Sequence, residues 1–146
     1  MSFASLTRRV TFAAAHRYRR PEWSEEKNQS VFGACANPSF HGHSYVCEVT
    51  VRGAIDETTG FSVDLGLLDR ILMREVRERF DHRNINVDVP EFADGKLVPT
   101  GENLARFICE RVQLALAQQT EGLARVTAVS VAEDETLRVT FMPESV

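Results

Sequence analysis

Two histidines stand side by side in the sequence with a single glycine between them, as His41-Gly42-His43. Residues i and i+2 of a β-strand point to the same face, so in an extended segment both imidazoles can reach one metal ion. A third histidine, His16, ends another segment with strand character. Three neutral imidazoles with a vacant fourth position are the ligands of a catalytic zinc site. The His-x-His spacing alone is a weak signal, and histidines that bind no metal explain it equally well.

Cys35 lies six positions before His41, in a segment with Gly, Asn and Pro that leads into the histidine pair. A thiol beside a dication and imidazoles has a lowered pKa and can serve as a base or a nucleophile. Alternatively, Cys35 is a fourth zinc ligand, which would close the site and make it structural. Cys47 and Cys109 fall on strand and helix patterns, where a free cysteine behaves as a small buried hydrophobe.

Asp81 and His82 follow directly on a helical pattern. A carboxylate that orients an imidazole, which in turn relays a proton from a thiol, is a known catalytic arrangement. Adjacent residues make that contact only where the chain turns irregularly. Spacing alone therefore favours a helix end at which the histidine caps carbonyl groups and the carboxylate is solvated.

Two further carboxylates, Glu133 and Glu135, stand between the last two strand-like segments. In a turn they would be solvated, whereas a carboxylate that faces a cavity can accept two parallel N–H bonds from a heterocycle. The sequence has no glycine-rich phosphate loop, no G-x-G-x-x-G and no serine nucleophile elbow. Chemistry driven by a nucleotide or a nicotinamide is therefore not expected.

The segments that must position these residues alternate between two patterns. Apolar residues at spacings of three and four predict helices over residues 65–80 and 104–116, with Asp64 and Thr100 as their N-caps and Gly122 at the end of the second. Strand character marks residues 6–16, 43–52, 125–132 and 136–142.

The order strand, strand, helix, helix, strand, strand predicts an α+β fold with an antiparallel four-stranded sheet and both helices on one face. Residues 133–135 join the last two strands as a hairpin. Residues 17–40 have no regular apolar pattern and read as one long loop, and loops of that length in compact domains are functional or disordered.

The 146 residues are expected to form one domain over residues 1–146. Seventeen basic against 21 acidic residues give a net charge of −4, which argues against a nucleic-acid partner. No apolar stretch approaches the ~20 residues of a membrane span, so no membrane partner is expected. Three cysteines cannot all pair, which favours a reducing compartment, and we expect a cytoplasmic protein.

Taken together, these residues resemble the 6-pyruvoyl-tetrahydropterin synthase family, which includes the 6-carboxytetrahydropterin synthases of bacterial deazapurine biosynthesis. Six motifs occur in family order and span nearly the whole chain: FAAAH (12–16), CANPSFHGHSY (35–45), GFSVDL (60–65), FDHRNIN (80–86), PTGENLA (99–105) and VSVAE (129–133). The resemblance implies the tunnelling fold, in which three subunits close a barrel and two trimers stack as a homohexamer.

The same resemblance assigns roles to individual residues. It implies that Cys35 is the catalytic base or acid and that Asp81 and His82 reach it from a neighbouring subunit. It also implies that Glu133 anchors the pterin ring, with Thr100 nearby. The zinc ligands would be His16, His41 and His43.

Two positions depart from the family pattern. Asp134 follows Glu133 where the family usually has Thr, and Glu135-Thr136 restores the pair two positions later, so Glu135 is an alternative anchor. Gly101 stands where Ser, Thr or Ala is commoner.

The family substrate is 7,8-dihydroneopterin triphosphate, a small molecule whose side-chain hydroxyls zinc would make acidic. Proton shifts then move the oxidation level into the ring, and triphosphate is eliminated without an external redox cofactor. Five residues separate Cys35 from His41, as in the pyruvoyl-forming enzymes, whereas the carboxy-forming enzymes typically have three. We therefore expect the pyruvoyl reaction. Side-chain cleavage that releases acetaldehyde, in the queuosine pathway, is the alternative, and a silent pterin-binding protein with structural zinc is a third.

Overall fold

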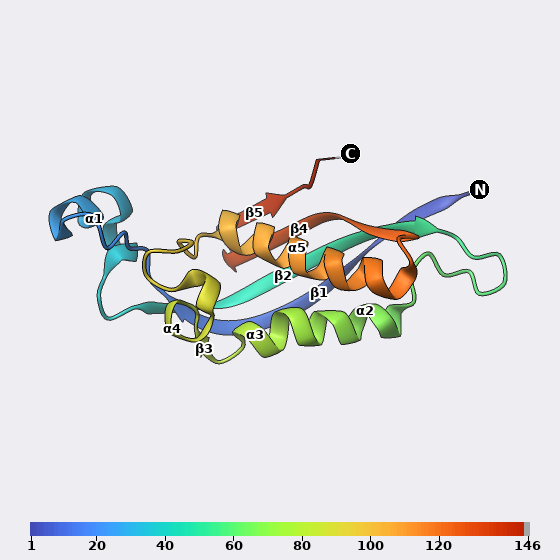
Figure 1. Ribbon diagram of the computed structural model, residues 1–146, viewed down its shortest axis with the longest axis horizontal. Coiled ribbons are helices and arrows are strands. Elements are labelled where there is room, and N and C mark those ends of the chain that lie inside the picture. The colour runs from blue at the N-terminus through green and yellow to red at the C-terminus, as the bar shows by residue number, and fades with distance from the viewer. Residues whose placement is uncertain (145–146) are drawn as a thin grey trace.

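The computed structural model describes residues 1–144 of the chain as a mixed α+β structure built on one sheet (Figure 1). The strands lie in the order β3-β1-β2-β4-β5. Their bounds are β1 (Phe3–His16), β2 (His41–Ala54), β3 (Arg83–Asn84), β4 (Ala124–Asp134) and β5 (Leu137–Phe141). The four long strands are antiparallel, as expected. The expectation of only four strands was wrong: β3 adds a fifth, two-residue strand, parallel to β1 at Ala14 and Ala15.

The pairing of β1 with β2 determines which residues meet at the end of the sheet. The register runs without a shift from Phe3 opposite Ala54 to His16 opposite His41. Alternate residues of β2 are buried from Tyr45 onward, which matches the period of two in the sequence. Because side chains two apart share a face, this register brings His43 to the same side as His16 and His41.

Both expected helices are present and begin at the expected caps. The first comprises α2 (Leu65–Leu72), a π-helical turn (Met73–Arg77) and α3 (Glu78–Phe80). The second is α5 (Gly101–Thr120). The Asp64 carboxylate accepts a hydrogen bond from the Leu67 N–H (3.2 Å), and the Thr100 hydroxyl accepts one from the Asn103 N–H (3.2 Å). Each cap satisfies one of the unpaired donors of a helix start.

Two glycines, Gly101 and Gly122, lie at the start and just beyond the end of α5. A Cβ atom on Gly101 would lie 2.8 Å from the Val139 side chain of β5, so any other residue there would force the helix or that side chain to shift. At the other end Glu121 takes the left-handed conformation (φ 55°), and Gly122 follows with φ 77°. A left-handed residue ends many helices, and a glycine adopts that conformation without steric cost.

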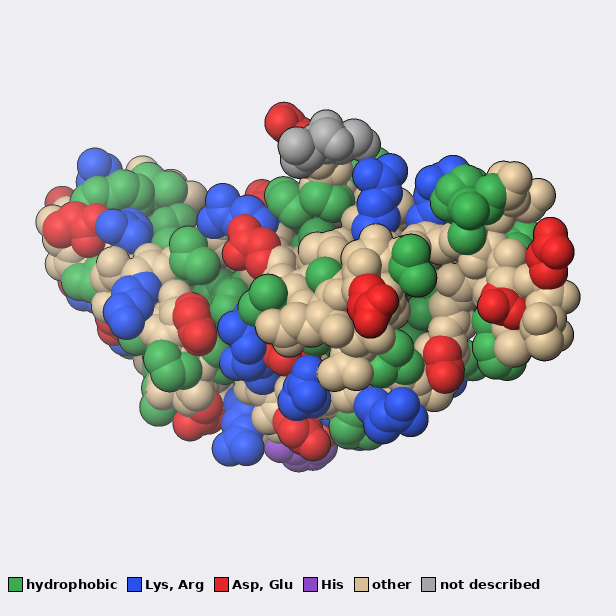
Figure 2. Space-filling view, turned by 45° about the vertical axis from the view of Figure 1, so that its right-hand side comes forward, with side chains coloured by type: hydrophobic (Ala, Val, Ile, Leu, Met, Phe, Trp, Pro, Cys, Tyr) green, Lys and Arg blue, Asp and Glu red, His purple; other side chains and the backbone are tan. Residues whose placement is uncertain are grey.

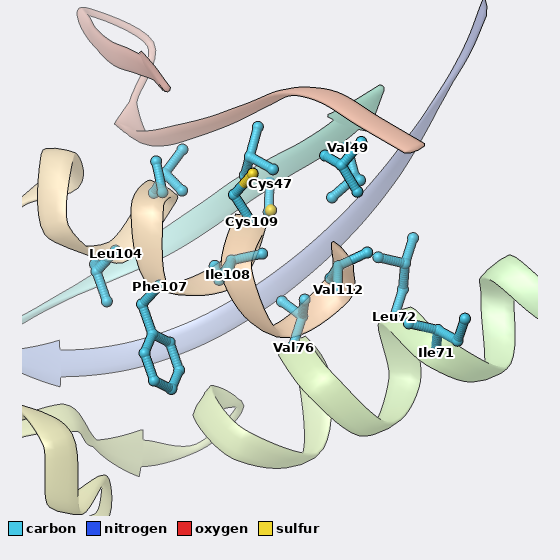
Figure 3. Close-up of a cluster of buried hydrophobic side chains, with 14 of the residues drawn as sticks. Cys47, Val49, Ile71, Leu72, Val76, Leu104, Phe107, Ile108, Cys109 and Val112 are labelled. Atoms are coloured by element: carbon cyan, nitrogen blue, oxygen red, sulfur yellow. The ribbon is translucent and has the colours of Figure 1, made fainter. Parts of the chain in front are cut away.

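The hydrophobic core lies between the helices and one face of the sheet. Figure 3 shows Cys109 of α5 directed toward the sheet, where Cys47 and Val49 of β2 are fully buried. As expected from their patterns, Cys47 and Cys109 are buried and free. The helix-free face is polar instead and includes Thr7, Arg9, Glu48, Thr50, Arg138 and Thr140. In the view of Figure 2, acidic and basic side chains are interspersed over the surface.

The segment expected to be one long loop contains a helix, so that expectation was wrong. It holds α1 (Glu25–Phe32) and a 3₁₀ turn (Gly33–Ala36), which project at one end of the molecule (Figure 1). The fully buried Asn28 fixes this segment, because its amide accepts from the Arg20 N–H (2.8 Å) and donates to the Arg20 carbonyl (3.1 Å). A segment that is held by polar hydrogen bonds of this kind needs no apolar stripe, so its sequence shows none.

Two short helical pieces, α4 (Ile85–Asp88) and a 3₁₀ turn (Pro90–Phe92), connect β3 with α5. The expected hairpin between β4 and β5 is present, and the Asp134 carboxylate accepts from the N–H and the hydroxyl of Thr136, both at 2.7 Å. Among the helices within residues 1–144, none combines the length and the apolar character that crossing a membrane requires.

Candidate metal centre and catalytic residues

The three histidines expected to bind zinc converge at the end of β1 and β2. Ring centroids are 4.7 Å apart for His16 and His41, 4.9 Å for His41 and His43, and 5.1 Å for His16 and His43. One nitrogen from each ring lies within 4.8 Å of the others, a spacing that could hold one ion. The strand register alone produces this cluster, because two of the rings are neighbours along β2 and the third is paired opposite them.

His16 is completely buried, and its orientation is fixed by neighbours on two sides. Its Nδ1 donates to the carbonyl oxygen of Pro99 (2.9 Å), and the Tyr45 hydroxyl lies 3.0 Å from the same nitrogen. Burial lowers the pKa of His16 to about 4 against the bond to Pro99, so the ring is neutral near pH 7. A neutral ring whose Nδ1 donates carries its lone pair on Nε2, which can then bind a metal, and the Tyr45 hydroxyl lies 3.3 Å from that nitrogen.

The other two rings also fit a bound cation. The Nε2 atom of His43 is buried and has no hydrogen-bond partner among the described residues. Burial, and then the neighbouring His43, lower the pKa of His41. An unpaired buried nitrogen is costly unless a partner completes it. Three imidazole nitrogens within 4.8 Å of one another are a donor set suited to Zn²⁺.

Glu133, one of the two possible anchors, lies beside this cluster. Its Oε2 is 3.7 Å from His43 Nε2, and its Oε1 is 3.9 Å from His16 Nε2. Tyr18 donates a hydrogen bond from its hydroxyl to Oε1 (2.9 Å). Glu135 lies exposed in the turn that follows β4. Of the two carboxylates, Glu133 is therefore the one beside the histidines, and Glu135 lines the hollow next to them.

An open hollow of about 550 Å³ adjoins these groups on the helix-free side of the sheet. Its lining includes His43, Ser44, Glu133 and Arg138. Thr100, expected near the pterin, is half-buried at the start of α5, directly after the Pro99 that holds His16. The volume falls within the range typical of sites for small molecules.

Cys35 lies in the 3₁₀ turn after α1 and is partly exposed. Its carbonyl oxygen accepts a hydrogen bond from the backbone N–H of Tyr18 (2.7 Å), which ties the turn to the strand end that carries His16. Cys35 does not belong to the group of ligand atoms that lie within 4.8 Å of one another, which within residues 1–144 comprises the three histidines. The structure thus places Cys35 outside the cluster of candidate metal ligands.

Burial, and next the Glu133 carboxylate, raise the pKa of the Cys35 thiol. The sequence suggested a lowered pKa for this thiol, because a dication and imidazoles were expected as its neighbours. The protein groups around the sulfur act in the opposite direction, since both low polarity and negative charge disfavour a thiolate.

The side chains of Asp81 and His82 contact each other, which the sequence alone did not favour for two adjacent residues. The His82 backbone takes φ 58°, and its Nδ1 lies 3.1 Å from Asp81 Oδ2. The other Asp81 oxygen accepts from the Ala13 N–H (2.9 Å), and this bond holds the pKa of Asp81 below its usual value. The spacing-based interpretation of a solvated carboxylate was therefore wrong, because pairing with β1 forces the irregular turn.

This pair lies at an edge of the sheet and faces outward. The His82 side chain is 83% exposed, whereas that of Asp81 is 17% exposed. No hydrogen bond or ion pair links either residue to Cys35 within the described chain. One chain thus brings the three histidines together with Glu133, and His82 lines an open hollow that reaches His43.

Sequence reasoning missed Tyr18, which contacts several site residues. A weak signal was available, because Tyr18 stands two positions after His16, just as Tyr45 stands two positions after His43. In an extended chain such residues share a face. Nothing local indicated that its hydroxyl would meet Glu133, which lies 115 residues further on.

Comparison with known proteins agrees with this geometry. The sequence profile of the 6-pyruvoyl tetrahydropterin synthase family matches residues 5–144. The chain is 41% identical over 113 residues to the 6-pyruvoyl tetrahydrobiopterin synthase of Homo sapiens, covering 77% of each protein. It is 28% identical over 112 residues to the 6-carboxy-5,6,7,8-tetrahydropterin synthase of Rickettsia typhi, covering 68% of this chain and 72% of that protein.

The fold is shared with solved structures as well. The structure of Caenorhabditis elegans 6-pyruvoyl tetrahydropterin synthase is similar with a TM-score of 0.89 and 30% sequence identity, covering 99% of this chain and 98% of that one. The α+β tunnelling fold expected from the sequence is thereby confirmed for the subunit. The chain belongs to the 6-pyruvoyl tetrahydropterin synthase family.

Proposed function

We propose that this protein is a zinc-dependent lyase that converts 7,8-dihydroneopterin triphosphate into 6-pyruvoyl-tetrahydropterin and eliminates triphosphate. The observation that carries the proposal is the cluster of His16, His41 and His43 with the Glu133 carboxylate beside it. The higher identity to the pyruvoyl-forming human relative than to the carboxy-forming bacterial one supports this product.

His16, His41 and His43 would hold the zinc ion through the ring nitrogens that face one another. When bound, zinc supplies Lewis-acid chemistry that makes the hydroxyl groups of the substrate side chain more acidic. The Pro99 carbonyl keeps His16 in the tautomer that a ligand needs, because its oxygen accepts a hydrogen bond from the Nδ1–H group. The fold thus sets the tautomer of His16 independently of a bound cation.

The remaining residues act on the substrate itself. Glu133 has one carboxylate oxygen that accepts from Tyr18 and a second that is available to accept N–H bonds from the pterin ring. Cys35 moves a proton at the substrate side chain. It would act there as the base or the acid, and burial and the Glu133 carboxylate raise the pKa of its thiol.

Asp81 and His82 complete the proton relay from a neighbouring subunit in this proposal. His82 is oriented by Asp81 and directed outward, which is the arrangement required of a residue that serves another protomer's Cys35. Beyond Ala14 and Ala15, the outer edge of β1 has no strand partner within residues 1–144, and the same holds for the outer edge of β5. Unpaired edges are templates for strand pairing. We therefore propose a barrel of three subunits and a homohexamer of two trimers.

The free cysteines bear on the cellular compartment in which the protein works. All three cysteines of the sequence lie within the described residues and are free thiols. Free thiols are typical of a reducing compartment, so we propose a cytoplasmic enzyme that acts on a small molecule and on neither nucleic acid nor membrane.

Product identification tests the proposal directly. Purified protein with added Zn²⁺ is incubated with 7,8-dihydroneopterin triphosphate, and products are identified by mass spectrometry under anaerobic conditions. The pyruvoyl product with free triphosphate supports the proposal. Formation of 6-carboxy-5,6,7,8-tetrahydropterin with acetaldehyde would instead assign the alternative activity. Intact substrate would indicate a pterin-binding protein with structural zinc.

A pair of variants separates the site from the adjacent turn. Glu133→Gln removes the charge beside the histidines and should lower turnover at least about a hundredfold, because a carboxylate positioned against a heterocycle contributes charge-assisted bonds. Glu135→Gln makes the same chemical change at the exposed position two residues away and should retain turnover. Equal losses in both variants would remove Glu133 from the proposed site.

A further inference from the structure

Tyr18 is joined to three parts of the candidate site. Its hydroxyl donates to Glu133 Oε1 (2.9 Å), and its backbone N–H donates to the carbonyl oxygen of Cys35 (2.7 Å). Its ring meets that of His16 edge-on, with centroids 5.1 Å apart, and packs against Phe32 at 5.8 Å. Both the backbone and the ring of Tyr18 are held, so its hydroxyl is a donor fixed in position.

The carboxylate that accepts this bond lies close to where a fourth metal ligand would be. Glu133 oxygens are 3.7 Å from His43 Nε2 and 3.9 Å from His16 Nε2. In a tetrahedral zinc site with bonds of about 2.05 Å, neighbouring ligand atoms are about 3.4 Å apart. The observed distances exceed this value only slightly. A small rotation of the Glu133 side chain would therefore bring an oxygen within ligand range.

Such a rotation would change what the centre can do. Three histidines and one carboxylate form a closed site with four protein ligands, whereas a substrate needs the fourth position. A carboxylate is attracted to a dication, so something must hold it back. Among the described residues Tyr18 is the only hydrogen-bond donor to Glu133, and it binds the oxygen that lies nearer to His16.

We propose that Tyr18 is a positioning residue that keeps the Glu133 carboxylate from becoming a metal ligand and thereby keeps the fourth position open to substrate. The inference rests on the proposed function only in requiring that the three histidines hold a metal ion. It does not depend on which pterin product is formed. Loss of the Tyr18 hydroxyl releases Glu133 toward the metal and converts an open centre into a closed one.

The test follows the metal rather than turnover. The full-length protein is loaded with Co²⁺, whose visible spectrum changes with its ligands, and sodium azide serves as a small anion that binds an open position. Tyr18→Phe removes a single oxygen atom and keeps the ring contacts. We expect azide to bind this variant at least about tenfold more weakly than wild type, because the carboxylate competes for the position. Loss of Co²⁺ to a chelator should be slower in the variant.

Two further variants distinguish release of Glu133 from general loosening of the site. Tyr18→Phe combined with Glu133→Gln should regain the azide affinity of wild type, because a neutral amide is a poor ligand for the ion. Phe32→Leu removes a ring that packs against Tyr18 but leaves the hydroxyl bond to Glu133 in place. Its azide affinity should stay within about twofold of wild type.

The outcomes separate this inference from the proposed function. Equal azide affinity in wild type and Tyr18→Phe, or no recovery in the double variant, would overturn the role of Tyr18. A wild-type Co²⁺ spectrum that azide leaves unchanged would also overturn it, since the fourth position would already be closed. If wild type takes up no Co²⁺, the metal-dependent function itself fails. If it takes up Co²⁺ and the variant behaves as wild type, only this inference fails.

Discussion

Replacing Glu75 with Gln should destabilise the fold measurably without touching the candidate site. Glu75 is only 5% exposed and lies in the π-helical turn between α2 and α3. Its Oε2 accepts from Arg79 Nε (2.9 Å) and from Arg111 Nε of α5 (3.3 Å), and its Oε1 accepts from Arg74 Nε (3.3 Å). The carboxylate therefore joins the two long helices that cover the sheet.

The magnitude follows from the exposure of the partners. A hydrogen bond to a charged group contributes about 1.5–3 kcal/mol when well formed, whereas exposed ion pairs contribute about 0–1 kcal/mol. The side chains of Arg79 and Arg111 are 29% and 37% exposed, and that of Arg74 is 59% exposed. Of the three hydrogen bonds to Glu75, only the short one from Arg79 is therefore expected to contribute nearly as much as a well-formed bond to a charged group. Glu75→Gln should lower the free energy of unfolding by about 2 kcal/mol and the melting temperature by about 5 °C.

The pH dependence gives the same prediction a second test. Burial by itself raises the pKa of Glu75, but hydrogen bonds and charge from Arg79 and Arg111 bring it below its ordinary value of 4.5. A lowered pKa in the folded state stabilises the protein above the unfolded pKa, and this contribution is lost as the pH falls through the folded pKa. The stability difference between wild type and Glu75→Gln should be constant near neutral pH and shrink below about pH 4.5.

Urea denaturation followed by far-ultraviolet circular dichroism measures both effects. Glu78→Gln is the matched control, because Glu78 lies on the same helix and is exposed. The control should unfold within about 0.5 kcal/mol of wild type. A loss below about 0.5 kcal/mol for Glu75→Gln, or an equal loss in both variants, would refute the reasoning, since the buried carboxylate would then contribute no more than a surface one.

Three further predictions concern the site. Wild type should bind about one zinc per chain and His41→Ala should lose it, as measured by elemental analysis; full retention would contradict the three-histidine centre. Cys35→Ala should keep zinc and abolish turnover, because the thiol lies outside the ligand cluster, and loss of metal with the thiol would make Cys35 a ligand. Mixing Cys35→Ala with His82→Ala under subunit exchange should restore part of the activity, and no restoration despite demonstrated exchange would argue against a shared site.

The sequence predicts those parts of the fold that depend on local pattern. Asp64 and Thr100 cap the helices as expected, because a cap needs only a side-chain oxygen and an N–H three residues on. The alternation that begins at Tyr45 identifies β2 for the same reason. Convergence of the histidines could also be foreseen, since it requires only that two strands pair with their ends level.

Features that depend on contacts distant in sequence escaped prediction. Helix α1 has no apolar stripe and is held by the buried amide of Asn28. Strand β3 is two residues long and exists only because Arg83 and Asn84 lie against β1. The bond from Tyr18 to Glu133 joins opposite ends of the chain. None of these leaves a periodic signal, because each is set by the tertiary structure.

The π-helical turn at Met73–Arg77 makes the length of its helix as important as its composition. A π turn contains one residue more than an α-helical turn, so the helix beyond it keeps the phase that a regular helix would have. One residue can therefore be removed there while Phe80 stays buried and Asp81 stays near the Ala13 amide. One residue added to the regular turns of α2 would instead rotate all that follows by about 100° and misdirect His82 as thoroughly as replacing it.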